Sequence, residues 1–366
     1  MSKSYYIIPI FVPHEGCPHD CVFCNQDKIT GVKKDSLRIV KDTEKRDISY
    51  SNDENEEVTA ESVRKTVYEY LETIDHSNAV VEISFFGGTF TGIKEEKQKE
   101  LLQVAREFKD KGFIDKIRLS TRPDYINQYI LSYLKEYRVD IIELGVQSLN
   151  EEILLKAGRG HDVEDVSKAS KLIKEYGFIL GHQIMPGLPG DDFKTDIETT
   201  KASIEMKPDI CRIYPALTIR GTAMEIMYKR GDYVPYTLEE AVEISKEMYK
   251  MYRHNSVNVI RIGLQPTETI NEKNDVVAGP FHPAFRELVE SSLMIELILE
   301  NMKEQEKAEI HINPKEISKL YANKKMYFNR LKDNKKNIKV EQNNDIERGK
   351  IILYLENKKV RSEERR

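Results

Sequence analysis

The chain has 366 residues, of which 39% are hydrophobic and 33% charged, and this composition is typical of a globular protein of about two domains. No run approaches the roughly 18 consecutive apolar residues of a membrane-spanning helix, so no membrane partner is expected. The start, MSKSYYIIPIFVPH, lacks a small-residue cleavage site and predicts a first strand rather than a signal peptide. Four cysteines, three of them crowded together, do not make a secreted disulfide framework, so we expect a cytoplasmic protein.

The first predicted strand leads into a loop that holds three of the four cysteines. Cys17, Cys21 and Cys24 form the pattern Cys-x-x-x-Cys-x-x-Cys. Three thiolates on one loop suit a cubane iron–sulfur cluster whose remaining iron is open to a small molecule. Three other interpretations stay open at this point: a structural zinc with a distant ligand, a redox disulfide with a spare thiol, and chance clustering.

Beyond the loop, residues 32–58 are polar and predict a surface excursion, and a regular alternation follows. Short β-rich apolar runs alternate with amphipathic helices, which predicts βαβ units and a parallel sheet. The predicted strands cover residues 7–11, 79–88, 115–123, 139–148, 178–190 and 209–215, and the predicted helices cover residues 59–75, 94–111, 124–137, 162–176 and 191–206.

Small and polar residues gather at the C-terminal ends of the predicted strands, where parallel barrels place their functional groups. They are Gly87, Gly88 and Thr89, then Ser120 and Thr121, then Gln147 with Arg159 after it, and finally Gly187 and Gly190. Paired glycines let a backbone approach a ligand, and a guanidinium is a bidentate partner for a carboxylate. Each also has an ordinary interpretation, as a turn, a strand-end hydrogen bond or a solvated arginine. We expect His161 and His182 to be structural or to face a substrate.

The cysteine pattern, with Phe23 before its last cysteine, resembles the signature loop of the radical S-adenosylmethionine (SAM) enzymes. The resemblance implies an α/β fold, an incomplete (β/α)6 barrel with a small α/β C-terminal appendage. It also implies a 4Fe–4S cluster, bound SAM, and a flavodoxin or ferredoxin as electron donor. The implied cluster ligands are Cys17, Cys21 and Cys24, and the implied SAM contacts are Phe23, Gly87, Gly88, Thr89, Ser120, Gln147 and Arg159.

The motifs GVQS, RGH, MPGLPG and RIYPALTIRGT look like the radical SAM portion of the Elongator catalytic subunit, from about residue 5 to about residue 266. They resemble oxygen-independent coproporphyrinogen oxidase more loosely. That catalytic subunit spreads its cysteines over a longer loop and carries an acetyltransferase domain. Here Gly279 and Gly349 are the only glycines beyond residue 263, so no Gly-rich pyrophosphate loop is expected there. The resemblance therefore points to the short bacterial Elongator-like radical SAM proteins without that domain.

We expect a core barrel over residues 1–266 and a separate extension over residues 267–366. The net charge of the whole chain is −5, but from residue 301 onward it has 18 Lys and Arg against 11 Asp and Glu. Residues 319–339 hold eight basic side chains and one Asp, with Tyr321, Tyr327 and Phe328 between them. Such a segment would suit a single-stranded RNA or tRNA loop. The alternative is a solvated lysine face over a small core.

The expected function is that of a radical SAM enzyme, which cleaves SAM reductively to a 5′-deoxyadenosyl radical and abstracts hydrogen from a substrate such as tRNA. Three alternatives remain. One is an enzyme acting on a porphyrin-like small molecule. A second is a carrier of a cluster, SAM or haem without turnover, and the third is a structural zinc protein.

Overall fold

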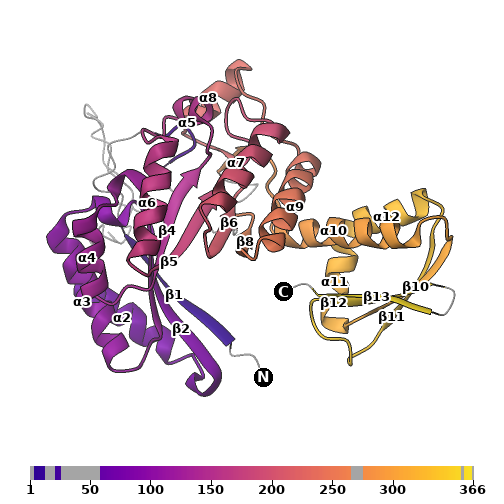
Figure 1. The fold of residues 1–366 in the computed structure, drawn as a ribbon, viewed down its shortest axis with the longest axis horizontal. Helices are drawn as coiled ribbons and strands as arrows, with labels where there is room; N and C mark the ends of the chain where they lie inside the picture. Colours follow the sequence, from indigo (N-terminus) through magenta and orange to yellow (C-terminus); the bar gives the residue numbers. More distant parts are fainter. Residues whose placement is uncertain (1–3, 13–20, 26–57, 265–274, 356–357, 365–366) are drawn as a thin grey trace, which may run out of the picture.

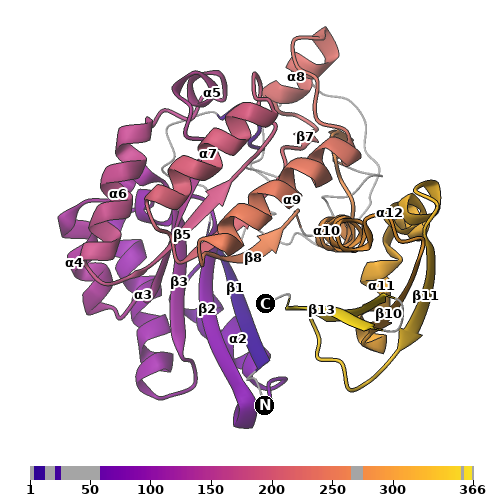
Figure 2. The same ribbon diagram turned by 45° about the vertical axis from the view of Figure 1, so that its right-hand side comes forward.

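The computed structural model describes residues 4–12, 21–25, 58–264, 275–355 and 358–364. Within these residues a seven-stranded sheet forms the larger part of the molecule and curls into a half-barrel (Figures 1 and 2). In spatial order its strands are β1 (Ser4–Val12), β2 (Ala79–Gly87), β3 (Lys116–Thr121), β4 (Ile141–Gln147), β5 (Ile179–Ile184), β6 (Ile210–Ile213) and β8 (Asn258–Ile262). Neighbouring strands are all parallel, so every strand ends at the same edge.

Helices connect the strands and cover the outer face of the half-barrel (Figure 2). The covering helices are α2 (Ala60–Leu71), α3 (Glu95–Asp110), α4 (Gln128–Glu136), α6 (Val163–Glu175), α7 (Phe193–Glu205) and α9 (Leu238–His254). Two further helices, α5 (Glu151–Lys156) and α8 (Ala223–Arg230), lie at the edge where the strands end (Figures 1 and 2).

Alternation along the strands separates the two faces of the sheet. On β2, Val81, Ile83 and Phe85 join the hydrophobic core, because successive side chains of a strand point to opposite faces. Glu82 and Ser84 consequently point to the inner face. The sheet therefore has an apolar face against the helices and an inner face that carries charge.

The predicted α/β fold and all six predicted strands are confirmed. The expected helix at residues 124–137 starts as a 3-10 turn, Pro123–Tyr125, and becomes α-helical at Gln128. The seventh strand, β8, was not predicted. It follows the short strand β7 (Thr218–Ile219) and two helices, which interrupt the regular alternation, and β7 pairs antiparallel with β9 (Val276–Ala278), which comes after β8. Nearly all of the expected surface excursion at residues 32–58 lies outside the described residues.

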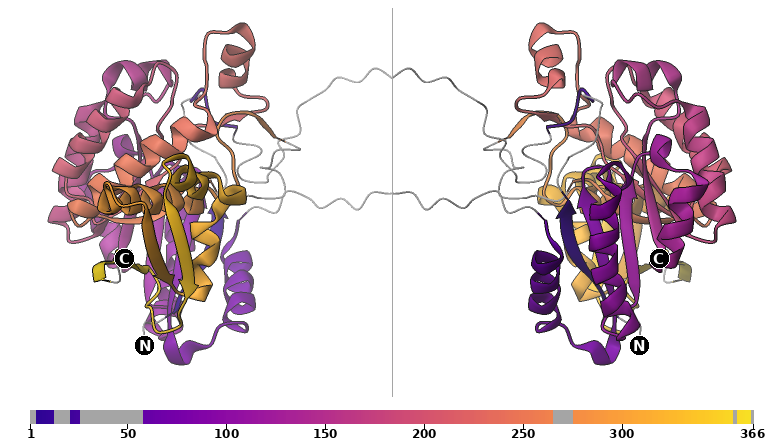
Figure 3. Two further views of the ribbon diagram at one scale, coloured as in Figure 1. Left: turned by 90° about the vertical axis from the view of Figure 1, so that its right-hand side faces the viewer. Right: turned by 90° about the vertical axis from the view of Figure 1, so that its left-hand side faces the viewer.

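The C-terminal residues form a second, smaller unit around its own sheet (Figure 3). Its strands, in spatial order, are β11 (Asn337–Gln342), β10 (Lys307–Ile312), β12 (Lys350–Leu355) and β13 (Lys358–Glu364), and its helices are α10 (Phe285–Met302), α11 (Ile317–Leu320) and α12 (Ala322–Asp333). Helix α10 packs against both α9 and α12, and so belongs to both units. The boundary at residue 266 stays a prediction.

Among the described helices, none combines the length and the hydropathy needed to cross a membrane.

Candidate functional site

The described part of the cysteine loop, residues 21–25, is held at the edge where the strands end. The backbone N–H of Val22 donates to the carbonyl of Ala157, just after α5, at 3.0 Å. The carbonyl of Val22 accepts from the N–H of Met224 in α8 at 2.8 Å. Helices α5 and α8 therefore fix the position of this segment relative to the sheet.

Two of the three predicted cluster ligands lie in this segment. The N–H of Cys24 donates to the carbonyl of Cys21 at 2.9 Å and closes a turn. Cys21 is buried and Cys24 is half-buried. Cys17 lies outside the described residues. The described turn brings two soft metal ligands close together.

Arg159, predicted to bind a carboxylate, lies beside this turn. Its side chain is buried, and its Nη1 lies 3.3 Å from the sulfur of Cys21. Its Nη2 donates to the carbonyl of Gly145 on β4 at 2.6 Å, and its Cζ lies 5.9 Å from the centre of the Phe23 ring. One guanidinium thus joins the cysteine turn to the end of β4.

The end of β4 holds buried polar atoms that have no hydrogen-bond partner among the described residues. These atoms are Gln147 Oε1, Arg159 Nε and His161 Nδ1. Buried polar groups are normally satisfied, so such a group of atoms in one place indicates a missing partner. The backbone of Gln147 is also unusual, with a φ of 67°, a conformation that costs a non-glycine residue free energy and is common at functional sites.

The protonation of His161 decides what the missing partner must offer. Burial and the Arg159 guanidinium lower the pKa of His161 to about 3, so its imidazole is neutral at pH 7. Its Nε2 lies 3.3 Å from the carbonyl of Val146 and donates to it, which leaves Nδ1 as an acceptor. Gln147 Oε1 is a second acceptor, and Arg159 Nε is a donor. A ligand with a carboxylate and hydroxyl groups has the matching chemistry.

Gly145 belongs to the same site and was missed in the sequence. A Cβ at this position would lie 3.2 Å from Gln147 Nε2 and 3.3 Å from Arg159 Nη2. The absent side chain therefore leaves room for both groups. A glycine in the middle of the apolar run VDIIELGVQS was the available signal, because such a glycine often marks a close approach of other groups.

The glycine pair of the second strand lies at the same edge of the sheet. Gly87 has a φ of 105°, which favours glycine, and it pairs in register with Val12, the last residue before the cysteine loop. The N–H of Gly88 lies 3.5 Å from the carbonyl of Val12, and Thr89 is buried. This backbone therefore lies next to the point where the cysteine loop leaves the sheet.

The inner face carries a layer of paired charges below that edge. Arg118 on β3 lies between two buried carboxylates and donates to Glu82 on β2 (2.9 Å) and to Glu143 on β4. Glu143 also accepts from Arg212 on β6 and from Gln183 on β5, both at 3.0 Å. Burial raises the pKa of Glu143, but Arg212 and Arg118 outweigh it and hold that pKa below its usual value. The layer is a closed ionic network.

Ser120 lies in this layer and not with the unsatisfied atoms of β4. Its hydroxyl is 3.4 Å from Glu143 Oε2 and 3.4 Å from Gln183 Nε2. The structure thus brings together Gln147, Arg159 and the cysteine turn, and places Ser120 in the neighbouring layer.

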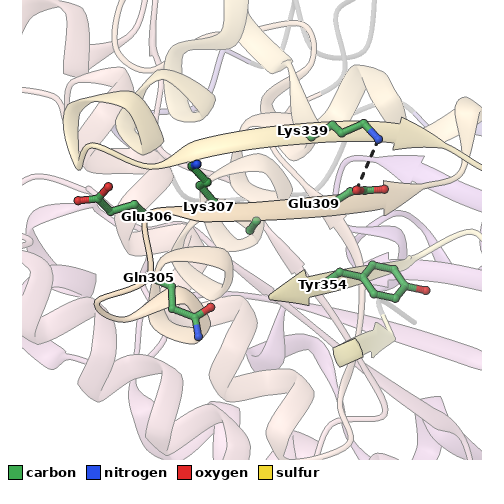
Figure 4. A pocket seen from close by; sticks show the side chains of 7 residues that line it. Gln305, Glu306, Lys307, Glu309, Lys339 and Tyr354 are labelled. Carbon is green, nitrogen blue, oxygen red and sulfur yellow. Dashed lines mark ion pairs between the residues drawn. The ribbon is translucent and has the colours of Figure 1, made fainter. Parts of the chain in front are cut away.

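In residues 319–339, which were considered as an RNA-binding segment, two of the aromatic rings are buried while most of the basic side chains are exposed. Tyr327 and Phe328 are buried in the core, so these rings are not available to stack on bases. Lys339 forms ion pairs with Glu309 and Glu341, beside a hollow of about 550 Å3 (Figure 4). The remaining exposed basic side chains of the segment are Lys324, Lys325, Arg330, Lys332 and Lys335.

Residues 11–201 match the radical SAM superfamily, and residues 208–294 match the radical SAM C-terminal domain. The chain is 31% identical to a tRNA uridine(34) acetyltransferase of Methanocaldococcus jannaschii over 261 residues, 65% of this chain and 47% of that protein. It is 31% identical to human Elongator complex protein 3 over 196 residues, 48% of this chain and 36% of that protein. The chain thus spans about half the length of these relatives or less.

Among solved structures, the archaeal Methanocaldococcus infernus Elp3 with a deleted N-terminus shares the fold, with a TM-score of 0.57 and 23% identity over 81% of this chain and 64% of that chain. The family match covers more than half of the chain, the half-barrel agrees with it, and the cysteine turn lies where the strands end. The chain belongs to the radical SAM superfamily.

Proposed function

We propose that this protein is a radical SAM enzyme whose cysteine loop and strand ends hold a 4Fe–4S cluster and SAM. When bound, this pair supplies reductive cleavage of SAM to methionine and a 5′-deoxyadenosyl radical, which abstracts hydrogen from a substrate. The observation that carries the proposal is the contact between the Arg159 guanidinium and Cys21, beside the unsatisfied atoms of β4.

The donor set fits the two groups. Cys17, Cys21 and Cys24 would ligate three irons of the cluster. Arg159 Nε would donate to the SAM carboxylate, and Gln147 Oε1 and His161 Nδ1 would accept from its hydroxyls. The other proposed SAM contacts are the ring of Phe23, the backbone of Gly87 and Gly88, and the hydroxyls of Thr89 and Ser120.

Within the protein, Arg159 has two tasks. Its guanidinium contacts the sulfur of Cys21, and its buried positive charge would orient a carboxylate. Helices α5 and α8 hold the turn that carries the thiols, so their packing would limit access of water. A flavodoxin or ferredoxin in the cytoplasm would donate the electron.

For the substrate we propose an RNA, and specifically a tRNA, because two relatives that each match over 261 residues are named as tRNA uridine(34) acetyltransferases. The chain spans only about half of those proteins, so the group that they transfer is not part of the proposal. The exposed basic side chains within residues 319–339, in the proposed extension of residues 267–366, would contact phosphates outside the proposed core of residues 1–266.

The test is anaerobic reconstitution with iron and sulfide, followed by dithionite and SAM and an assay for 5′-deoxyadenosine. We expect wild type to form it and Cys24→Ala to form none. Cys211→Ala is the matched control, because Cys211 is buried on the outer face of β6 and should not affect the product. Failure of the wild type to assemble a cluster would overturn the proposal.

The RNA substrate is tested separately by charge reversal. A variant with Lys324, Lys325, Lys332 and Lys335 changed to Glu should bind tRNA at least tenfold more weakly. Each phosphate contact that is lost reduces the number of counterions released on binding. A control with Lys168, Lys171 and Lys194 changed to Glu alters exposed lysines of α6 and α7. Equal loss in both variants would count against a specific RNA surface.

A further inference from the structure

The inner face of the half-barrel exposes aromatic rings near the edge where the strands end. Phe11 on β1 is 51% exposed and pairs in register with Phe86 on β2. The centres of the two rings are 6.4 Å apart. Single exposed apolar residues are ordinary, but adjacent rings on a concave face provide a surface for another planar group.

Arg212 crosses the inner face from β6 to these rings. Its Cζ lies 5.2 Å from the centre of the Phe86 ring, although β2 and β6 are not neighbours in the sheet. Glu143 binds its Nε, and the hydroxyl of Tyr214 accepts from its Nη1 at 3.0 Å. A guanidinium that is fixed next to an aromatic ring can itself stack on a nucleobase.

Arg261 on β8 differs from the other arginines of the inner face. It pairs in register with Arg212, so both side chains leave the same face of the sheet. Arg118 and Arg212 each bind a glutamate, whereas half-buried Arg261 forms no ion pair or hydrogen bond with any described residue. A half-buried charge without a counter-charge is unfavourable, and a bound anion would offset this cost.

Arg261 also lines a hollow of about 580 Å3 at the open edge of β8. Arg286 and Lys319 line the same hollow, but both are bound to Glu290, at 2.9 and 3.1 Å. Glu287 lines the hollow as well and has no ion pair among the described residues. Among the described residues that line the hollow, Arg261 is therefore the one cation without an ion pair, and Glu287 is a carboxylate that would oppose a bound anion.

We propose that this face binds one nucleotide unit of the substrate, with the base against Phe11, Phe86 and Arg212 and the phosphate on Arg261. The proposal rests on the proposed RNA substrate and names its subsite within the barrel. Planar stacking surfaces together with a free guanidinium are the groups by which proteins bind single-stranded nucleotides.

The experiment is calorimetric binding of uridine 5′-monophosphate and of uridine to the reconstituted protein. A pyrimidine is used because it lacks the adenine of SAM. Wild type should bind the monophosphate about tenfold more tightly than the nucleoside, and Arg261→Ala should remove this difference. Arg261→Ala should also lower the salt slope of RNA binding by about one unit. Arg106→Ala is the matched control, because Arg106 is a half-buried arginine on α3, away from the proposed subsite.

Two further variants separate the phosphate from the base. Glu287→Gln should tighten binding of the monophosphate only, because it removes the opposing carboxylate. Phe86→Leu should weaken both ligands equally. Equal binding of nucleoside and monophosphate by wild type, or binding of neither, overturns the subsite.

Basal 5′-deoxyadenosine formation, measured on the same samples, distinguishes this outcome from failure of the proposed function. Arg261→Ala should leave that basal reaction unchanged, since Arg261 has no part in the proposed cluster or SAM contacts.

Discussion

The inner layer of the barrel and the end of β4 both contain buried polar side chains, but they differ in how these are satisfied. In the layer, Arg118, Glu143 and Arg212 bind one another on three strands. At the end of β4, Gln147 and Arg159 keep polar atoms that have no partner in the part of the chain that the structure describes, and the backbone of Gln147 is strained. A closed network stabilises the fold, whereas an open one has partners left to bind. The comparison therefore separates groups that serve stability from groups that serve a ligand.

The largest expected effect on stability comes from removing a carboxylate from the ionic network on the inner face. Glu143→Ala would leave the buried Arg212 guanidinium without a carboxylate and would remove one of the two carboxylates that bind Arg118, so it should lower the free energy of unfolding by roughly 3–5 kcal/mol. Urea unfolding measures this. The control is Glu152→Ala, an exposed glutamate paired with Lys156, which should leave stability nearly unchanged. Similar losses in both variants would show that the layer is not the stabilising network.

A buried histidine on the outer face of the sheet, with hydrogen-bond partners on both ring nitrogens, should make stability depend on pH. His182 is buried between the hydroxyls of Ser170 (3.0 Å) and Ser203 (2.8 Å), and burial lowers its pKa to about 3. Between about pH 6.5 and 3, the histidine of the unfolded chain, with a pKa of about 6.5, binds a proton that the folded protein does not bind at this position. Stability is therefore fully present above pH 6.5 and falls as the pH drops below it, by up to about 1.4 kcal/mol per pH unit.

Unfolding between pH 4 and 7 tests this in wild type and in His182→Gln. The variant should lose that part of the pH dependence. An unchanged slope would mean that the imidazole is not held neutral.

At the end of β4, a small added side chain should weaken SAM binding without destabilising the fold. The methyl group of Gly145→Ala would press on Gln147 and Arg159, and should weaken SAM binding about tenfold, or about 1.4 kcal/mol. Calorimetry on the reconstituted variant measures the affinity, and urea unfolding checks that stability is retained. Unchanged affinity would place SAM away from these two side chains.

The smallest effect should have opposite signs for stability and binding. Gln147→Gly removes a strained backbone and an unsatisfied buried amide, so the free energy of unfolding should rise by about 1 kcal/mol. SAM affinity should fall because the amide acceptor is lost. If the variant were less stable and bound SAM normally, the strain at Gln147 would have a structural role only.

The sequence was sufficient for the alternation of strands and helices and for the cysteine pattern, because both follow local rules of periodicity and spacing. It was not sufficient for β8, which follows an irregular segment, or for the partners of side chains. For Tyr327 and Phe328 it left open whether the rings would contact RNA or form a small core, and they pack in the core. Gly145 and His161 join the site only because the segment after α5 folds back on the end of β4, where Arg159 contacts the carbonyl of Gly145 and His161 that of Val146, and local patterns do not contain these contacts.

The most direct test of the account is the effect of SAM on the electron paramagnetic resonance spectrum of the reduced cluster. Wild type should show a spectrum that changes when SAM is added. Arg159→Ala should keep the cluster signal, since the thiols remain, but lose the change with SAM at concentrations that saturate wild type. A full response to SAM in Arg159→Ala would contradict the claim that the cysteine turn and the end of β4 form one site.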